Sequence, residues 1–253
     1  LNQRKTIKNI KNKKIDLNKL FISSKKLKVL ILGEIIIDQY FFCETLGKSG
    51  KDPVLQMHEQ ENEVYLGGAA AIAGNVSQFC NNVTLMSMIG DDKQYLDLIK
   101  KTLPKNTNLK LIYKEKSPTI IKKKYVDIVT NNKVFGSYII NDSPLKKKNE
   151  KKLNTFLNKN LKKYDLVIVS DYGHGFISNK NASLISKRSN FIALNAQINA
   201  ANRGFHTMNK YKNLDCVIIN ETELRHELRD KNGQVNDLMK KLANQIKIKD
   251  LVV

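Results

Sequence analysis

Short apolar runs alternate with segments of helical periodicity along most of this chain. Each run is followed directly by Gly, Asp or Asn, and the clearest are residues 27–37, 83–89, 165–170, 191–194 and 214–219. Continuous apolar runs of this length are typical of strands buried on both faces, as in a parallel sheet. Since strands separated by helices form βα units, the sequence predicts an α/β fold of three layers, with a mostly parallel central sheet flanked by helices.

Two β-rich segments stand outside this alternation. Residues at about 54–66 and 119–140 carry strand-forming side chains, and Asn131-Asn132 offers a hairpin turn in the second segment. They predict a small β lid, with residues 41–53 as a loop. Residues 1–26 are rich in Lys and Asn and predict a basic, poorly ordered arm or a short helix, before a domain over 27–253.

The formal net charge of +20 raises the question of nucleic-acid binding. Lysines occur in every segment, however, and the basic clusters are not interleaved with aromatic side chains that could stack on bases. We therefore do not expect nucleic acid as the main partner. The chain has no apolar run long enough to span a membrane, and its three cysteines are far apart, which favours a cytoplasmic protein without a disulfide framework or zinc site.

The stretch 65–79, YLGGAAAIAGNVSQF, places two glycines and a block of small residues between a strand-like and a helix-like run. Glycine lets backbone approach backbone, or a ligand, where a Cβ would clash. Two interpretations stay open on spacing alone: a tight turn before a closely packed helix, or a ligand site.

Polar residues follow five of the predicted strands, namely Asp38, Asp91, Asp171, Asn195 and Asn220. The carboxyl ends of strands in an open α/β sheet share one edge, where ligands bind. Some of the five are expected to be helix N-caps, with Asp91 or Asp92 capping a helix to about residue 103. We expect at least two to contact a ligand.

Four stretches in order resemble the ribokinase-like (PfkB-type) carbohydrate kinases, above all the kinase half of bifunctional ADP-heptose synthases. GEIIIDQY at 33–40 looks like the first strand with its sugar-binding aspartate, and LGGAAAIAGN at 66–75 like the glycine signature. SDYGHG at 170–175 resembles the SDYxKG loop, and NETE at 220–223 fits the NxxE motif. The resemblance covers about residues 27–253.

This resemblance implies a kinase that transfers the γ-phosphoryl group of ATP to a hydroxyl of a sugar or sugar phosphate, with Mg²⁺. Implied substrate-binding residues are Asp38, Gly67, Gly68, Asn75 and Asp171. Implied phosphate- and cofactor-binding residues are Asn220, Glu223, Lys122 and Lys124, with Glu223 holding Mg²⁺ through water. The lysines have a second interpretation, as solvated lid residues. A homodimer formed through the lid is also implied.

The chain departs from the family pattern at three positions. Ala71 and Asn195 stand where Asn and Asp are usual, and His174 stands where the heptose kinases have Lys. The family's GAGD motif, which supplies the catalytic base, is expected beyond Val253, so we assign no catalytic residue here. We expect the N-terminal part of a longer, possibly bifunctional enzyme; the alternative is a non-catalytic, kinase-like sugar- or nucleotide-binding module.

Overall fold

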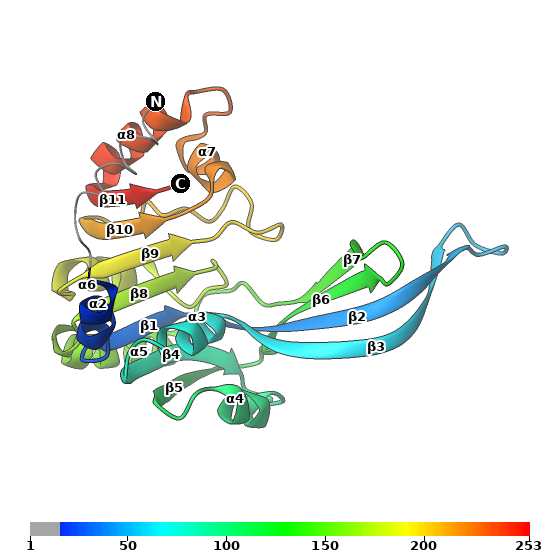
Figure 1. Cartoon of the computed structure of the whole chain (residues 1–253), viewed down its shortest axis with the longest axis horizontal. Coiled ribbons are helices and arrows are strands. Elements are labelled where there is room, and N and C mark those ends of the chain that lie inside the picture. The colour runs from blue at the N-terminus through cyan, green and yellow to red at the C-terminus, as the bar shows by residue number, and fades with distance from the viewer. Residues whose placement is uncertain (1–15) are drawn as a thin grey trace.

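The computed structural model describes residues 16–253, and a parallel seven-stranded sheet forms the centre of the molecule (Figure 1). Its strand order is β11-β10-β9-β8-β1-β4-β5, and every neighbouring pair is parallel. The strands are β1 (Lys28–Gly33), β4 (Asn82–Gly90), β5 (Thr107–Lys114), β8 (Leu166–Asp171), β9 (Ile192–Ala196), β10 (Leu214–Ile218) and β11 (Ile248–Val252). The predicted α/β class and parallel sheet are confirmed.

Helices cover both faces of this sheet. They are α3 (Ala69–Val76), α4 (Leu96–Thr102), α5 (Lys147–Asn160) with the 3-10 turn η1 (Leu161–Lys163), α6 (Asn179–Arg188), α7 (Glu221–Leu228) and α8 (Val235–Ile246). Alternate residues of β1 point to opposite sides: Leu30 and Leu32 join the core beneath α5 to α8, whereas Val29 and Ile31 pack with α3 and α4. Each fully buried leucine or isoleucine contributes about 1.5–3 kcal/mol.

A second sheet extends from the edge of the body (Figure 1). It contains β2 (Ile35–Lys48), β3 (Leu55–Gly68), β6 (Ile120–Asp127) and β7 (Asn132–Ile139), in the order β3-β2-β6-β7. The expectation of a loop over 41–53 is wrong for residues 41–48, which continue β2. The stacked rings of Phe41 and Tyr125, 4.9 Å apart, show why: aromatic cross-strand pairs stabilise strands and outweigh the weak turn signal there.

Within the predicted arm, residues 17–24 form helix α2 (Leu17–Ser24), which Asp16 caps by accepting a hydrogen bond from the Lys19 amide. Phe21 of this helix stacks on Phe79 with ring centroids 5.9 Å apart, so α2 packs on the domain. Residues 1–15 lie outside the described residues. Within residues 16–253, no helix is long and apolar enough to cross a membrane.

Candidate functional site

The glycine pair at the end of β3 lies against two carboxyl-bearing residues. A Cβ at Gly67 would lie 2.1 Å from Asp38 Oδ2, and a Cβ at Gly68 would lie 2.3 Å from the Glu34 carbonyl oxygen. Gly68 also has φ +60°, in the region that L side chains rarely adopt. It is followed by Ala69, the first residue of α3, whose amide donates to the Glu34 carbonyl at 2.9 Å. Bare backbone at these two positions therefore lets Asp38 and Glu34 approach the start of α3.

Asp38 forms an ion pair inside the lid. Lys124 Nζ donates to Asp38 Oδ1 at 2.7 Å and to the Tyr40 hydroxyl at 2.9 Å. Burial lowers the pKa of Lys124, but the hydrogen bonds to Asp38 and Tyr40 outweigh it and raise the pKa overall. Both partners keep about a fifth to a quarter of their side-chain surface exposed, at 21% for Asp38 and 24% for Lys124. The carboxylate is therefore held in place and still reachable from solvent.

Lys122 is the register partner of Asp38 on β6 and differs from Lys124 in its contacts. Its ammonium lies 5.5 Å from the ring centre of Tyr172 and 5.7 Å from that of Tyr138. Within residues 16–253 it forms no ion pair within 4 Å. Burial is the main cause that lowers its pKa. A cation held between aromatic faces in this way can bind an anion without first breaking an ion pair.

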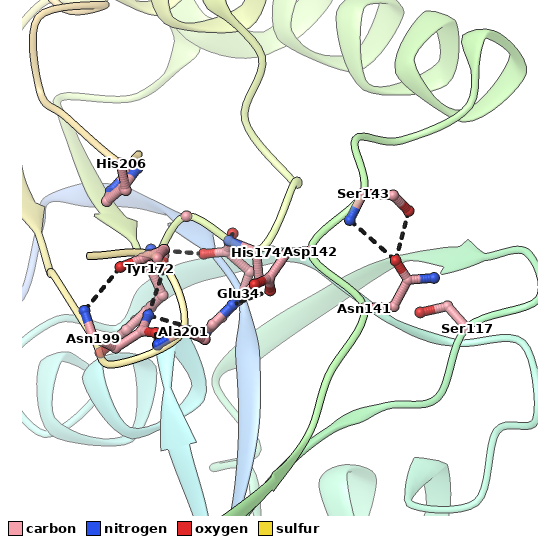
Figure 2. Close-up of polar contacts among 12 residues, drawn as sticks. Glu34, Ser117, Asn141, Asp142, Ser143, Tyr172, His174, Asn199, Ala201 and His206 are labelled. Atoms are coloured by element: carbon pink, nitrogen blue, oxygen red, sulfur yellow. Dashed lines mark hydrogen bonds and ion pairs between the residues drawn. The ribbon is translucent and has the colours of Figure 1, made fainter. Parts of the chain in front are cut away.

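The loop after β8 is fixed by the side chain of Glu34 (Figure 2). Glu34 Oε2 accepts from the Tyr172 amide at 3.0 Å, and Oε1 accepts from the His174 amide at 3.1 Å. Burial first, and then the charge of Asp171, raise the pKa of Glu34 from its usual 4.5 to about 7. Glu34 therefore joins the glycine turn to the 171–175 loop.

Asp171 is almost fully buried and its carboxylate is occupied by the protein itself. Lys210 Nζ and the Tyr211 hydroxyl both lie 2.6 Å from Asp171 Oδ2, and His206 Nε2 lies 3.1 Å from the Asp171 carbonyl oxygen. Burial opposes ionisation, but the charges of Lys210 and His206 dominate and lower the pKa of Asp171. In this arrangement Asp171 positions the loop, and a direct contact with substrate stays a prediction.

His174 ties the same loop to the exit of the lid (Figure 2). Its Nδ1 lies 2.6 Å from Asp142 Oδ1, just after β7, and its carbonyl oxygen accepts from Lys114 Nζ at 3.2 Å. Burial lowers the pKa of His174 despite the hydrogen bond to Asp142. A Cβ at Gly175 would lie 2.2 Å from the Ser143 carbonyl oxygen, so the lid exit and the loop are packed backbone to backbone.

Asn220 and Glu223 form a capping box at the start of α7. Asn220 Oδ1 accepts from the Glu223 amide and Glu223 Oε2 accepts from the Asn220 amide, both at 2.9 Å. Glu223 Oε1 accepts from the Ile198 amide at 3.3 Å. Each carboxylate oxygen thus has one backbone partner and a free lone pair, which can accept from a metal-bound water.

A chain of contacts places these residues along one region. Burial first, and to a lesser degree the charges of Glu34, Asp38 and Glu223, raise the pKa of the Tyr172 hydroxyl. The Tyr172 amide donates to Glu34 Oε2 at 3.0 Å. The Tyr172 carbonyl oxygen accepts from Asn199 Nδ2 at 3.0 Å, one residue from the Ile198 amide that binds Glu223. The lid, the glycine turn, the 171–175 loop and α7 are therefore contiguous.

Three residues from the sequence prediction have side chains that form no hydrogen bond with this cluster within residues 16–253. Asn75 is exposed in the last turn of α3, and Asn195 donates to the Ile218 carbonyl oxygen at 2.8 Å. Asp91 accepts from the Lys116 amide at 2.8 Å. The expectation that Asp91 or Asp92 caps a helix is wrong, because α4 begins only at Leu96 with Tyr95 as its N-cap.

The residues around the 171–175 loop include several that the sequence did not point to, of which Glu34, Lys114, Asn202 and Tyr211 are buried: Glu34, Lys114, Asp142, Asn199, Asn202, Lys210 and Tyr211. Only Glu34 carried a usable signal, since a carboxylate between the apolar runs LKVLILG and IIID is costly to bury without partners. Of the others, Lys114 is the last residue of β5. The rest belong to loops whose path the hydrophobic pattern does not determine.

Comparison with known proteins agrees with this architecture. The family model "pfkB family carbohydrate kinase" matches residues 26–253. The chain is 26% identical over 222 residues to the bifunctional protein HldE of Aliarcobacter butzleri, covering 85% of this chain and 45% of that protein. It is 26% identical over 220 residues to HldE of Campylobacter jejuni strain RM1221, covering 87% and 45%. The chain therefore spans less than half the length of these curated relatives.

Solved structures show the same fold. Phosphofructokinase-2 from Escherichia coli in complex with potassium superposes with a TM-score of 0.68 at 12% identity, covering 90% of this chain and 72% of that one. Ribokinase of Arabidopsis thaliana complexed with ribose and ATP superposes with a TM-score of 0.60 at 15% identity, covering 89% and 71%. With the family model matching nearly all of the described residues, the chain belongs to the pfkB family of carbohydrate kinases.

Proposed function

We propose that this chain is the sugar-binding kinase part of an ATP-dependent enzyme that phosphorylates a sugar or sugar phosphate of the heptose type. The resemblance of the four motifs to the kinase half of ADP-heptose synthases supports the heptose type. The ribokinase neighbour, whose structure contains ribose and ATP, supports the donor. Because the chain covers less than half of the HldE proteins, a role as the N-terminal part of a bifunctional enzyme belongs to the same proposal.

The contact between Asp38 and Gly67 is the observation on which this proposal rests. An ionised carboxylate can accept hydrogen bonds from two sugar hydroxyls. The missing Cβ of Gly67 lets Asp38 Oδ2 lie directly against the turn, which fixes the carboxylate there. A hollow of about 460 Å³ is lined by Asp38, Tyr40 and Tyr65, among other residues of the lid. Aromatic faces beside a carboxylate suit a sugar, which presents apolar C–H faces and polar hydroxyls.

The phosphate donor would approach from the side of α7. Phosphoryl transfer depends on positioning and charge neutralisation more than on covalent chemistry. Magnesium usually keeps several waters in such sites, and the free lone pairs of Glu223 fit it through water. When bound there, the ion would neutralise phosphate charge, while Asn220 and Glu223 hold the start of α7 in place. Lys122, which forms no ion pair with a carboxylate of residues 16–253, would bind an anionic group of a substrate.

Calorimetric titration with a panel of sugars and sugar phosphates tests the proposal, because it needs no turnover. The wild-type chain is compared with Asp38→Asn and with Asp52→Asn, an exposed control in the lid. We expect saturable binding of at least one sugar, weakened about tenfold or more by Asp38→Asn and unchanged by the control. Failure of every sugar to bind to the folded wild type would contradict the proposal.

A second reading, a kinase-like module that binds without catalysis, is favoured by one observation. Asp38 is already paired with Lys124, so a substrate must compete with that ion pair. Sugar binding with no phosphoryl transfer in the longest natural form of the protein would support this alternative.

Two smaller parts of the proposal concern location and assembly. The three cysteines, Cys43, Cys80 and Cys216, are free thiols, which is compatible with a reducing cytoplasm. A dimer formed through the lid is proposed on the family resemblance alone.

A further inference from the structure

Arginine is rare in this chain and three arginines line one cavity. The sequence contains 44 lysines and arginines together, of which the arginines are only Arg4, Arg188, Arg203, Arg225 and Arg229. A cavity of about 630 Å³ lies between α7 and the loop that joins β9 to β10, and Arg203, Arg225 and Arg229 all line it, with Lys231. A general bias towards lysine explains the +20 charge but not the presence of three of the five arginines around one cavity.

The cationic groups of this cavity are mostly free to bind a ligand. Within residues 16–253, Arg203, Arg229 and Lys231 form no ion pair. Arg225 is paired with Glu221 at 2.7 Å and also donates to backbone carbonyl oxygens of the 231–233 turn, so its guanidinium is held rigidly. Asp230 is the acidic residue of the lining, and its Oδ1 accepts from the Asn232 and Gly233 amides.

Hydroxyl and imidazole groups complete the lining. Thr222 and Thr207 face the cavity from α7 and from the loop, together with His206 and His226. Guanidinium groups match the oxygens of a phosphate in a two-point, planar geometry that an ammonium cannot provide. Hydroxyl and imidazole N–H groups donate to the same kind of oxygen. From these residues we infer that the cavity is a binding site for a phosphate-bearing small molecule.

The site is distinct from the hollow beside Asp38 and still contacts the loop network. Its lining shares no residue with the hollow. His206 lines the cavity and places Nε2 3.1 Å from the Asp171 carbonyl oxygen, so one side chain joins the cavity to the 171–175 loop. Thr222, the residue before Glu223, also lines it, and so does Ile198, whose amide donates to Glu223 Oε1. The phosphate could belong to the nucleotide donor or to a separate phosphorylated metabolite, and both share this chemistry.

The test uses pyrophosphate as the probe, with the full chain and calorimetric titration at moderate salt. Arg203→Ala/Arg229→Ala removes the two unpaired guanidinium groups. Lys100→Ala/Lys101→Ala, two exposed lysines of α4, removes the same charge elsewhere. Arg203→Lys/Arg229→Lys keeps the charge and removes the planar fork, which keeps the test decisive if the alanine variant fails to fold.

We expect saturable binding to the wild type, weakened about tenfold or more in both arginine variants and unchanged in the lysine control. A second titration, in the presence of a saturating non-hydrolysable ATP analogue, identifies the molecule whose phosphate occupies the cavity. Loss of pyrophosphate binding assigns the cavity to the phosphate donor. Retained binding assigns it to another phosphorylated metabolite. No saturable binding, or equal binding in all variants, would overturn the inference. Because no sugar is present, these results are independent of those that test sugar binding.

Discussion

Glu34 makes the stability of this protein depend on pH in a direction that is unusual for a carboxylate. Its pKa rises from 4.5 to about 7 because the side chain is buried and Asp171 lies near. Between these values the native state holds a proton that the unfolded state has released. Stability changes with pH in proportion to protons bound in the unfolded minus the native state, so this group makes stability fall as pH rises from 4.5 through 7.

The size of the effect follows from the same two values. At about 1.4 kcal/mol for each pKa unit, the difference between 4.5 and about 7 corresponds to about 3 kcal/mol of unfolding free energy. Glu34→Gln removes this titration. It also turns an amide NH₂ towards either the Tyr172 or the His174 amide, both of which now donate to the carboxylate. Two N–H donors then face each other without an acceptor, which lowers the free energy of unfolding by about 1–3 kcal/mol at every pH.

Urea unfolding of wild type and Glu34→Gln at pH 5 and pH 8.5 measures both the free energy linked to the titration of Glu34 and the cost of the unsatisfied donors. We expect the variant to be less stable at pH 5 by about 1–3 kcal/mol, and the gap to close or reverse at pH 8.5 because the wild type then carries a buried charge. Glu61→Gln, an exposed substitution on β3, is the control and should follow the wild type. Parallel pH dependence of wild type and Glu34→Gln would refute the reasoning.

Two further predictions concern the glycine turn and the α7 cap. Gly67→Ala pushes a methyl group against the Asp38 carboxylate and should abolish sugar binding in calorimetric titration, whereas Gly74→Ala, which meets open space within α3, should keep binding and raise stability by up to about 1 kcal/mol. Normal sugar binding by Gly67→Ala would contradict the site. Asn220→Ala removes the acceptor for the Glu223 amide and should cost about 1 kcal/mol in thermal or urea unfolding, and an unchanged stability would contradict the cap.

The sequence predicted the central sheet well because buried parallel strands leave a simple signal. Runs such as 83–89 and 165–170 are continuous and apolar, and both became strands of the body. The boundary at Glu34 was not predictable in the same way, since a single buried carboxylate inside an apolar run gives no period of its own. Only the fold shows that Glu34 lies between β1 and β2 and binds the 171–175 loop.

The sequence pointed to individual candidate residues but not to the contacts between them. The prediction that Asp38 and Asn220 both follow strands of the central sheet is wrong for Asp38, which lies inside β2 of the second sheet. Asn220 does follow β10, as the N-cap of α7. The partners of Asp171 could not be foreseen, because Lys210 and Tyr211 lie in a loop without periodicity, about 40 residues further along the chain. The pairing of Asp38 with Lys124 also depends on the register of β2 with β6, which short-range pattern cannot give.

A crystal structure of the chain with the sugar that binds best in the titration panel tests the central claim most directly. The account predicts the ring over the Gly67-Gly68 turn, with at least one hydroxyl within hydrogen-bond distance of Asp38 and the contact between Asp38 and Lys124 opened or shared. A sugar bound elsewhere, with Asp38 still paired only to Lys124, would contradict it.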